Sequence, residues 1–305
     1  MSGPLLRFED GKIALGGKDL LVHSANLSIA PSLEVERVYG DYDPAIAGAK
    51  TQFINFSPTS NLKGQLDISF YISADTFAID GVPNTVDRMF EIRDGMSELP
   101  INQNIVGRYS FDNMYLKSFG FDLSPFQIIK ATASYDIYGT IYKTIDRRFH
   151  KTNVDFAHAL KSFGRIEASG TDIDAAVARQ FEISSMKYNI NVTRKIYNTI
   201  RAAEHTSTNT NANGVVPARV TIENIESEMS LQSNEMIPLL NAYGDRQALT
   251  SPEGIADSEV EAFLYDMNAT KIARFLVKGK ITSQSNSISE GQYATSSISI
   301  REVIK

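Results

Sequence analysis

Cysteine is absent from this chain of 305 residues. A disulfide framework, a thiolate zinc site and a cysteine nucleophile are therefore excluded. The histidines are few and lack the short spacings of zinc ligands; they are His23, His150, His158 and His205. The glycine-rich phosphate motifs and the G-x-S-x-G elbow are also missing, and Gly16-Gly17-Lys18 predicts only a turn. We therefore expect no enzyme activity, no metal and no cofactor.

Long apolar runs are missing as well. No stretch approaches about 18 apolar residues, so no membrane span is predicted. The first residues lack a basic segment followed by an apolar one, so we expect no signal peptide and synthesis in a cytoplasm. The formal net charge of -6 argues against a basic surface that grips nucleic acid. The hydrophobic content of 42% is ordinary and predicts a folded chain with a real core.

The carboxylates that lie two residues apart include Glu34 and Glu36, Asp41 and Asp43, and Asp172 and Asp174. Glu34 and Glu36 would share one face of a strand, as an acid–base pair requires, but exposed charges on strands are far commoner than catalytic ones. Asp172 and Asp174 fit a helix N-terminus better than a calcium loop, and the remaining pair fits an exposed loop. We assign no catalytic residue.

A short basic cluster covers residues 143–151 and includes the aromatic Phe149. Cations interleaved with an aromatic ring are typical of contacts with single-stranded nucleic acid. Because the chain as a whole is acidic, a solvated connector or a contact between subunits is the preferred interpretation.

Alternation of apolar and polar residues predicts strands with one face of each kind. The clearest single strand is at residues 64–73, where Leu66, Ile68 and Phe70 alternate with polar residues. Residues 115–142 carry two such runs around Pro125, which predicts a long antiparallel hairpin. Further strands are predicted at residues 25–29, 186–192, 216–231, 275–281 and 293–303.

Helix caps and helical spacing predict a few short helices. They are expected at residues 86–93, 153–163, 173–180, 234–244 and 260–267. Together with the strands, they predict a mainly β fold with some helix.

The two halves present their patterns in a similar order: strand, loop, strand, helical insertion and closing hairpin. Residues 130–137 can be laid on 293–300 without a gap, and Phe119, Phe121 and Leu123 on Val277, Gly279 and Ile281. The opening strands, 25–29 and 186–190, also agree in phase. Such matches arise by chance in β-rich chains, but a duplication is the preferred interpretation. It predicts two similar antiparallel β-sandwich or barrel domains, at residues 1–148 and 181–305, joined by a helical connector at 149–180.

The order of these elements resembles the bacteriophage tail tube protein family. The resemblance is carried by a long strand ending in a loop (residues 24–43), the strand at 64–73 and the hairpin at 115–139. It extends over most of residues 20–142 and more weakly over 183–303. It implies β-sandwich or barrel domains whose strands join between subunits into a continuous inner barrel, a closure that removes exposed sheet edges.

The same resemblance implies a channel lining. The candidate channel-lining residues are Asp67, Ser69, Asp122, Ser134 and Asp136. Acidic and hydroxyl groups there would let DNA slide without adhering. The implied partners are other copies of the chain in rings of three or six chains, and other tail proteins such as sheath, baseplate or terminator. DNA would pass without sequence-specific binding, no membrane is involved, and the expected location is the virion tail.

Two alternatives remain open at this point. A baseplate hub, tube initiator, neck or tail terminator protein would share the composition. A non-viral β-rich binding protein would also fit the strands.

Overall fold

The computed structural model describes a little over half of the chain, and every structural statement below concerns that part. The residues that it describes are 13–20, 22–30, 33–39, 52–58, 63–72, 98–124, 127–139, 141–143, 167–169, 183–197, 219–234, 257–265, 271–291 and 293–304. All regular elements in these ranges are β-strands, so the expectation of a mainly β chain is confirmed. Within the same ranges, no helix is long and apolar enough to cross a membrane.

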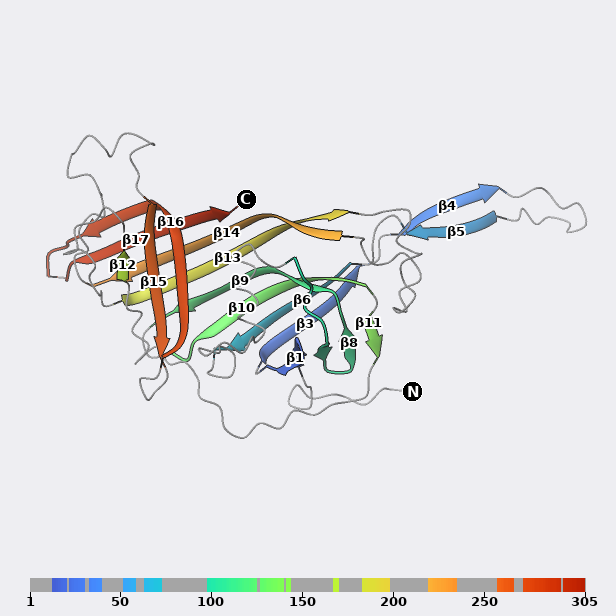
Figure 1. The fold of residues 1–305 in the computed structure, drawn as a ribbon, viewed down its shortest axis with the longest axis horizontal. Helices are drawn as coiled ribbons and strands as arrows, with labels where there is room; N and C mark the ends of the chain where they lie inside the picture. Colours follow the sequence, from blue (N-terminus) through green and yellow to red (C-terminus); the bar gives the residue numbers. More distant parts are fainter. Residues whose placement is uncertain are drawn as a thin grey trace, which may run out of the picture.

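A ten-stranded antiparallel sheet, the main sheet, forms most of the molecule (Figure 1). Its strands, in spatial order, are β12 (Glu167–Ser169), β15 (Asp257–Tyr265), β16 (Lys271–Ser287), β17 (Thr295–Ile304), β14 (Arg219–Ser233), β13 (Ile183–Tyr197), β9 (Met114–Leu123), β10 (Lys130–Tyr138), β6 (Lys63–Tyr71) and β3 (Val22–Ala30). The sheet runs without a break from one half of the chain into the other, because β9 pairs with β13.

Two smaller sheets accompany it. One has the order β11 (Ile141–Lys143), β8 (Tyr109–Phe111), β7 (Asn104–Val106), β1 (Ile13–Leu15) and β2 (Lys18–Asp19). The predicted turn between β1 and β2 is confirmed, with Gly16 and Gly17 at φ of 62° and 78°, a region that favours glycine. The other sheet pairs β4 (Leu33–Tyr39) with β5 (Gln52–Pro58), a hairpin that projects away from the main sheet in Figure 1.

The hydrophobic core lies on one face of the main sheet. Its cluster joins Phe70 and Phe119 from the first half of the chain to Tyr188, Met229 and Ile300 from the second. Residues of the five-stranded sheet, such as Leu15 and Phe111, belong to the same cluster, so this small sheet covers part of that face. Apolar burial of this extent is the main force that stabilises a folded chain.

The sequence-based strand predictions are largely confirmed. The hairpin expected at residues 115–142 is β9 paired with β10, and the C-terminal hairpin is β16 paired with β17. The single strand expected at 64–73 is β6, with the alternating burial that its sequence predicts.

The helix expected at residues 260–267 is wrong over residues 260–265, because these residues belong to strand β15, paired along its length with β16; residues 266 and 267 lie outside the described ranges. Glu, Ala and Leu favour a helix there, but ladder pairing with a neighbouring strand overrides a weak local preference. The expected helices at 86–93, 153–163 and 173–180 lie outside the described residues, as does nearly all of 234–244. Within the expected helical connector at 149–180, only Glu167–Ser169 is described, and it is a strand. The domain limits at 1–148 and 181–305 stay predictions.

Eight strands of the main sheet divide into two units with the same internal order. The first unit is β3-β6-β10-β9 and the second is β13-β14-β17-β16, each in the order first, second, fourth and third strand along the chain. All neighbours are antiparallel, so equivalent strands of the two units also run in the same direction. The strand topology therefore repeats.

Two β-bulges of each unit fall at equivalent positions. The first strand of each unit contains one extra residue, His23 in β3 and Ser184 in β13. The last strand of each unit contains a second extra residue, Lys117 in β9 and Thr282 in β16, which in both units lies three residues further along the ladder than the first. Bulges alter twist and register locally, so their agreement supports a duplicated unit.

The bulges define which residues of the two units correspond. They make Leu27 equivalent to Tyr188, which confirms the alignment of the opening strands made from sequence. They make Tyr135 equivalent to Ile300 and Leu116 equivalent to Ile281. The alignment of 130–137 with 293–300 is therefore wrong by two residues, because alternation cannot distinguish registers of equal phase. The alignment of Phe119 with Val277 is also wrong, since Phe119 corresponds to Gln284 and the extra residue Thr282 changes the phase between them.

Candidate functional site

The face of the main sheet opposite the core is lined with small polar residues. Its members come from seven adjacent strands and include Ser24, Asn26, Gln65, Asp67, Ser69, Thr132, Ser134, Asp136, Ser118, Asp122, Lys187, Asn189, Asn191, Glu226, Glu228, Ser230, Ser297, Ser299 and Arg301; this set is called the polar face. Period-two alternation produces it, because each of these residues lies between core positions. Asn26, Asp67, Ser134, Ser118, Asn191 and Glu226 form one continuous row of ladder neighbours.

All five residues that the sequence analysis selected lie on the polar face. Asp67 and Ser69 come from β6, Ser134 and Asp136 from β10, and Asp122 from β9. Asp67 is the ladder partner of Ser134. The structure thus brings the set onto one surface, and its role as a channel lining stays a prediction.

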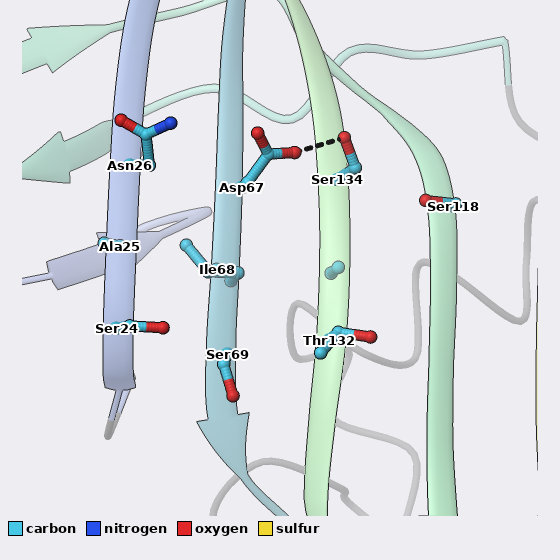
Figure 2. A pocket seen from close by; sticks show the side chains of 10 residues that line it. Ser24, Ala25, Asn26, Asp67, Ile68, Ser69, Ser118, Thr132 and Ser134 are labelled. Carbon is cyan, nitrogen blue, oxygen red and sulfur yellow. Dashed lines mark hydrogen bonds between the residues drawn. The ribbon is translucent and has the colours of Figure 1, made fainter.

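Hydrogen bonds hold the Asp67 carboxylate in place. Ser134 Oγ donates to Asp67 Oδ1 at 2.6 Å (Figure 2), and Gln65 Nε2 donates to the same atom at 3.0 Å. Hydrogen bonds to a charged acceptor are among the stronger ones in proteins. Because neighbouring side chains occupy its lone pairs, Asp67 presents less free acceptor capacity than an isolated carboxylate.

A hollow of about 350 Å³ lies over this part of the polar face. Asp67, Ser69 and Ser134 line it, together with serine and asparagine side chains from β3 and β9 (Figure 2). Asp122 lies instead at a second hollow, beside Tyr71 and Lys130. Hydroxyl, amide and carboxylate groups line both hollows.

Basic residues that the sequence analysis did not select share the polar face with the acids. Lys63 Nζ lies 3.2 Å from Asp136 Oδ2, and Arg301 Nη2 lies 2.7 Å from Glu226 Oε2. Lys187 is the ladder partner of Asp122. Exposed ion pairs add little stability, about 0–1 kcal/mol each. Their effect on the surface is larger, because they cancel much of the negative potential that the acids alone would create.

An aromatic and cationic cluster lies at one end of the polar face, where the two units meet. The Arg194 guanidinium of β13 lies 5.4 Å from the Tyr115 ring centre, and Nη1 donates to the Leu116 carbonyl. The rings of Tyr115 and Tyr138 are 5.8 Å apart, and Val220 completes the cluster. Cation–π contacts of this kind stabilise by about 0.5–2 kcal/mol. The cluster therefore attaches β13 to β9.

Burial changes the acid–base properties of this cluster. Desolvation disfavours the charged form and lowers the pKa of Arg194 to about 10. Desolvation, with the neighbouring Asp136 charge, raises the pKa of Tyr138 to about 12. The cluster was missed by the sequence analysis, because nothing local to Arg194 signals that β13 lies beside β9.

Metal and catalytic chemistry find no support in the described ranges. No three His, Cys, Asp or Glu residues gather there in a way that could hold a metal ion. His23 contacts the Tyr71 ring at 6.0 Å, and the other histidines lie outside these ranges. Glu34 and Glu36 lie on β4, whereas the other two carboxylate pairs, and residues 144–151 of the basic cluster, are outside the described ranges. The predicted absence of metal, cofactor and enzyme activity stays a prediction.

No known family model matches this chain, and no curated protein is similar to it in sequence.

Proposed function

We propose that this protein is a structural component of a bacteriophage tail, whose chains assemble into stacked rings that form a tube for DNA passage. The observation that carries the proposal is the main sheet, which buries one face and exposes small, charge-paired polar groups along the other. A ring of such sheets with the polar face inward would enclose a hydrated channel.

The chemistry of the polar face suits passage better than binding. Proteins grip DNA by placing uncompensated Lys and Arg against phosphates. Here Lys63 and Arg301 are paired with Asp136 and Glu226, so little net positive charge is presented to a phosphate. Serine, threonine and asparagine between them keep the surface wet. DNA inside such a channel would slide over water and hydroxyl groups.

The edges of the main sheet suit self-assembly. Strand β3 pairs only with β6 among the described strands, and the last part of β16 pairs only with β17. Exposed edges of this kind promote pairing with another chain unless they are covered. Rings of three or six chains would cover them, and sheath, baseplate or terminator proteins would be the partners at the ring surfaces.

Electron microscopy of the purified protein over a range of concentrations tests the proposal. We expect rings, or tubes with a central channel, at high concentration. Single rings that never stack would favour a hub, neck or terminator role over a tube subunit. A monomer at every concentration, verified by sedimentation velocity, would contradict the proposal and favour a β-rich binding protein.

A further inference from the structure

Equivalent strands of the two units differ in burial on their core side. In β13, the side chains of Met186, Tyr188 and Ile190 are at most 2% exposed. In β3, the equivalent of Ile190 is Ile29, which is 48% exposed, and Ala25 and Leu27 are only partly buried. The cause is the neighbour, since β9 covers β13 on its outer side and no described strand covers β3.

A matching feature lies in the last strand of the second unit, in the part of β16 beyond its pairing with β15. Residues 118–123 of β9 pair with β13, and the bulges make residues 283–288 their equivalents in the second unit. The 283–287 stretch of β16 pairs with β17 on one side, and no described strand pairs with its other side. Among the described strands, the first strand of the repeat, β3, and the 283–287 stretch of its last strand therefore each have a ladder partner on one side only.

We propose that β3 of one chain adds to the 283–287 stretch of β16 in a second chain, with the geometry of the β9–β13 ladder. The inference rests on the proposed self-assembly and names its contact. Equivalent strands run in the same direction, so this contact between chains is antiparallel, like the one within the chain. It joins unlike surfaces head to tail, and such contacts close into a ring when the rotation allows.

The internal ladder also supplies the register. Within the chain, Phe121 lies opposite Tyr188, Gly120 opposite Asn189 and Phe119 opposite Ile190. Replacing each residue by its equivalent places Leu27 opposite Asn286, Ser28 opposite Ser285 and Ile29 opposite Gln284. Only one register between β3 and β16 follows, because the bulges in the first and last strands fix which residues of the two units are equivalent.

The side chains at the central pair fit this register. In the internal ladder, a Cβ on Gly120 would collide with Asn189, so only small side chains fit at this pair of positions. Ser28 and Ser285 occupy the equivalent positions, and both are small and exposed. Covering the core side of β3 would also shield Ile29 and Leu27 from water, as β9 shields Ile190 and Tyr188.

Cysteine cross-linking tests the register directly, because the natural chain contains no cysteine. The variant Ser28→Cys/Ser285→Cys places two thiols on adjacent strands, where Cα atoms are about 4.5–5.5 Å apart and a disulfide can form. The matched controls, Ser28→Cys/Ser283→Cys and Ser28→Cys/Ser287→Cys, keep the same face but shift the pair by two residues. Diagonal neighbours are about 7–8 Å apart, which is too far for an unstrained bridge.

After mild oxidation, we expect covalent dimers and larger oligomers of the in-register variant on a non-reducing gel. The shifted variants should give at least about tenfold less covalent dimer, since the larger distance between their Cα atoms prevents the disulfide. Circular dichroism should show that all variants fold, because serine and cysteine are nearly isosteric. Hydrogen exchange of the natural chain gives a second readout: amides of residues 25–30 and 283–287 should gain protection as the chain assembles.

The two proposals fail in different ways. Rings in the micrographs without in-register cross-links, or with equal cross-linking of the shifted variants, would overturn the contact and leave the tube function standing. In-register oligomers that never form a ring or channel would support the contact and overturn the tube function.

Discussion

The two units of the main sheet share strand order, direction and bulges, yet their last strands differ in chemistry. On the core side, β9 carries Phe119 and Phe121, whereas the equivalent residues of β16 are Gln284 and Asn286. Phe121 packs against Tyr188 of β13 with ring centres 5.7 Å apart. Asn286 accepts a hydrogen bond from Ser296 at 2.7 Å. The same ladder geometry is therefore compatible with an aromatic or an amide side chain.

The difference separates a permanent contact from a reversible one. Aromatic pairs in a core add to the free energy of burial, so the β9–β13 contact is as stable as the fold itself. Burying a strand edge that carries amide side chains on its core side releases less free energy, because amides lose their contacts with water. We therefore expect contacts between chains to depend on concentration, while the contact within the chain does not.

The largest effect should come from one substitution made at two equivalent positions. Ile190→Lys places a charge in the core, where the side chain is 2% exposed, and should reduce the free energy of unfolding by more than about 4 kcal/mol. Ile29→Lys should leave the fold intact but prevent assembly, because a lysine on an edge strand opposes pairing. Urea unfolding and sedimentation velocity measure the two effects. Equal loss of stability in both variants would show that Ile29 is as buried as Ile190 and would contradict the difference in burial between β3 and β13.

A second pair compares the last strands of the units. Phe121→Ala should reduce the free energy of unfolding by about 3–5 kcal/mol, because it leaves a cavity beside Tyr188. Asn286→Ala should cost about 1 kcal/mol, the value of one hydrogen bond. Both are measured by urea unfolding followed by circular dichroism. A cost for Asn286→Ala as large as that for Phe121→Ala would contradict the distinction drawn between the two strands.

A third pair examines the cationic cluster where the units meet. Arg194→Ala should reduce the free energy of unfolding by about 1.5–3 kcal/mol, since it removes a hydrogen bond from a charged donor. Lys195→Ala is the control, because Lys195 is exposed and its contact with the Tyr197 ring, at 5.5 Å, lies in solvent. It should change stability by less than about 0.5 kcal/mol. Similar values for the two variants would remove Arg194 from the contact between the units.

The smallest effect concerns pH. The pKa of Tyr138 is raised from 10.0 to about 12, so the folded protein holds this proton more tightly than the unfolded chain does. The protonated Tyr138 therefore contributes to the free energy of unfolding below pH 10, and this contribution is lost as the pH rises towards 12. Tyr138→Phe should therefore make the loss of stability over this interval shallower. An identical slope in natural and Tyr138→Phe proteins would contradict burial as the cause.

Much of the fold follows from local alternation. The strands at 25–29, 64–73 and 186–192 were predictable because burial of one face imposes a period of two. Residues 260–265 were not, since their helical preference is overridden by pairing with β16. The alignment of 130–137 with 293–300 was wrong by two residues, because a shift of two leaves every side chain on its face.

The candidate site divides in the same way. Alternation suffices to place Asp67 and Ser69, or Ser134 and Asp136, on one face of their strand. The charge balance of the polar face was not predictable, because it depends on which strands are neighbours. Lys187 lies beside Asp122 only because β13 pairs with β9, and the two residues are far apart in the chain.

The sequence by itself determined the strand class, the two-faced character of the sheet and the absence of thiol chemistry, since these depend on residue type and local period. Tertiary structure alone decided the order of the strands, the joining of the two units through β9 and β13, and the single ladder partner that β3 and the last part of β16 have among the described strands. The physical reason is that hydrogen-bond ladders join residues distant in the chain, and local patterns carry no information about which partner a strand will choose.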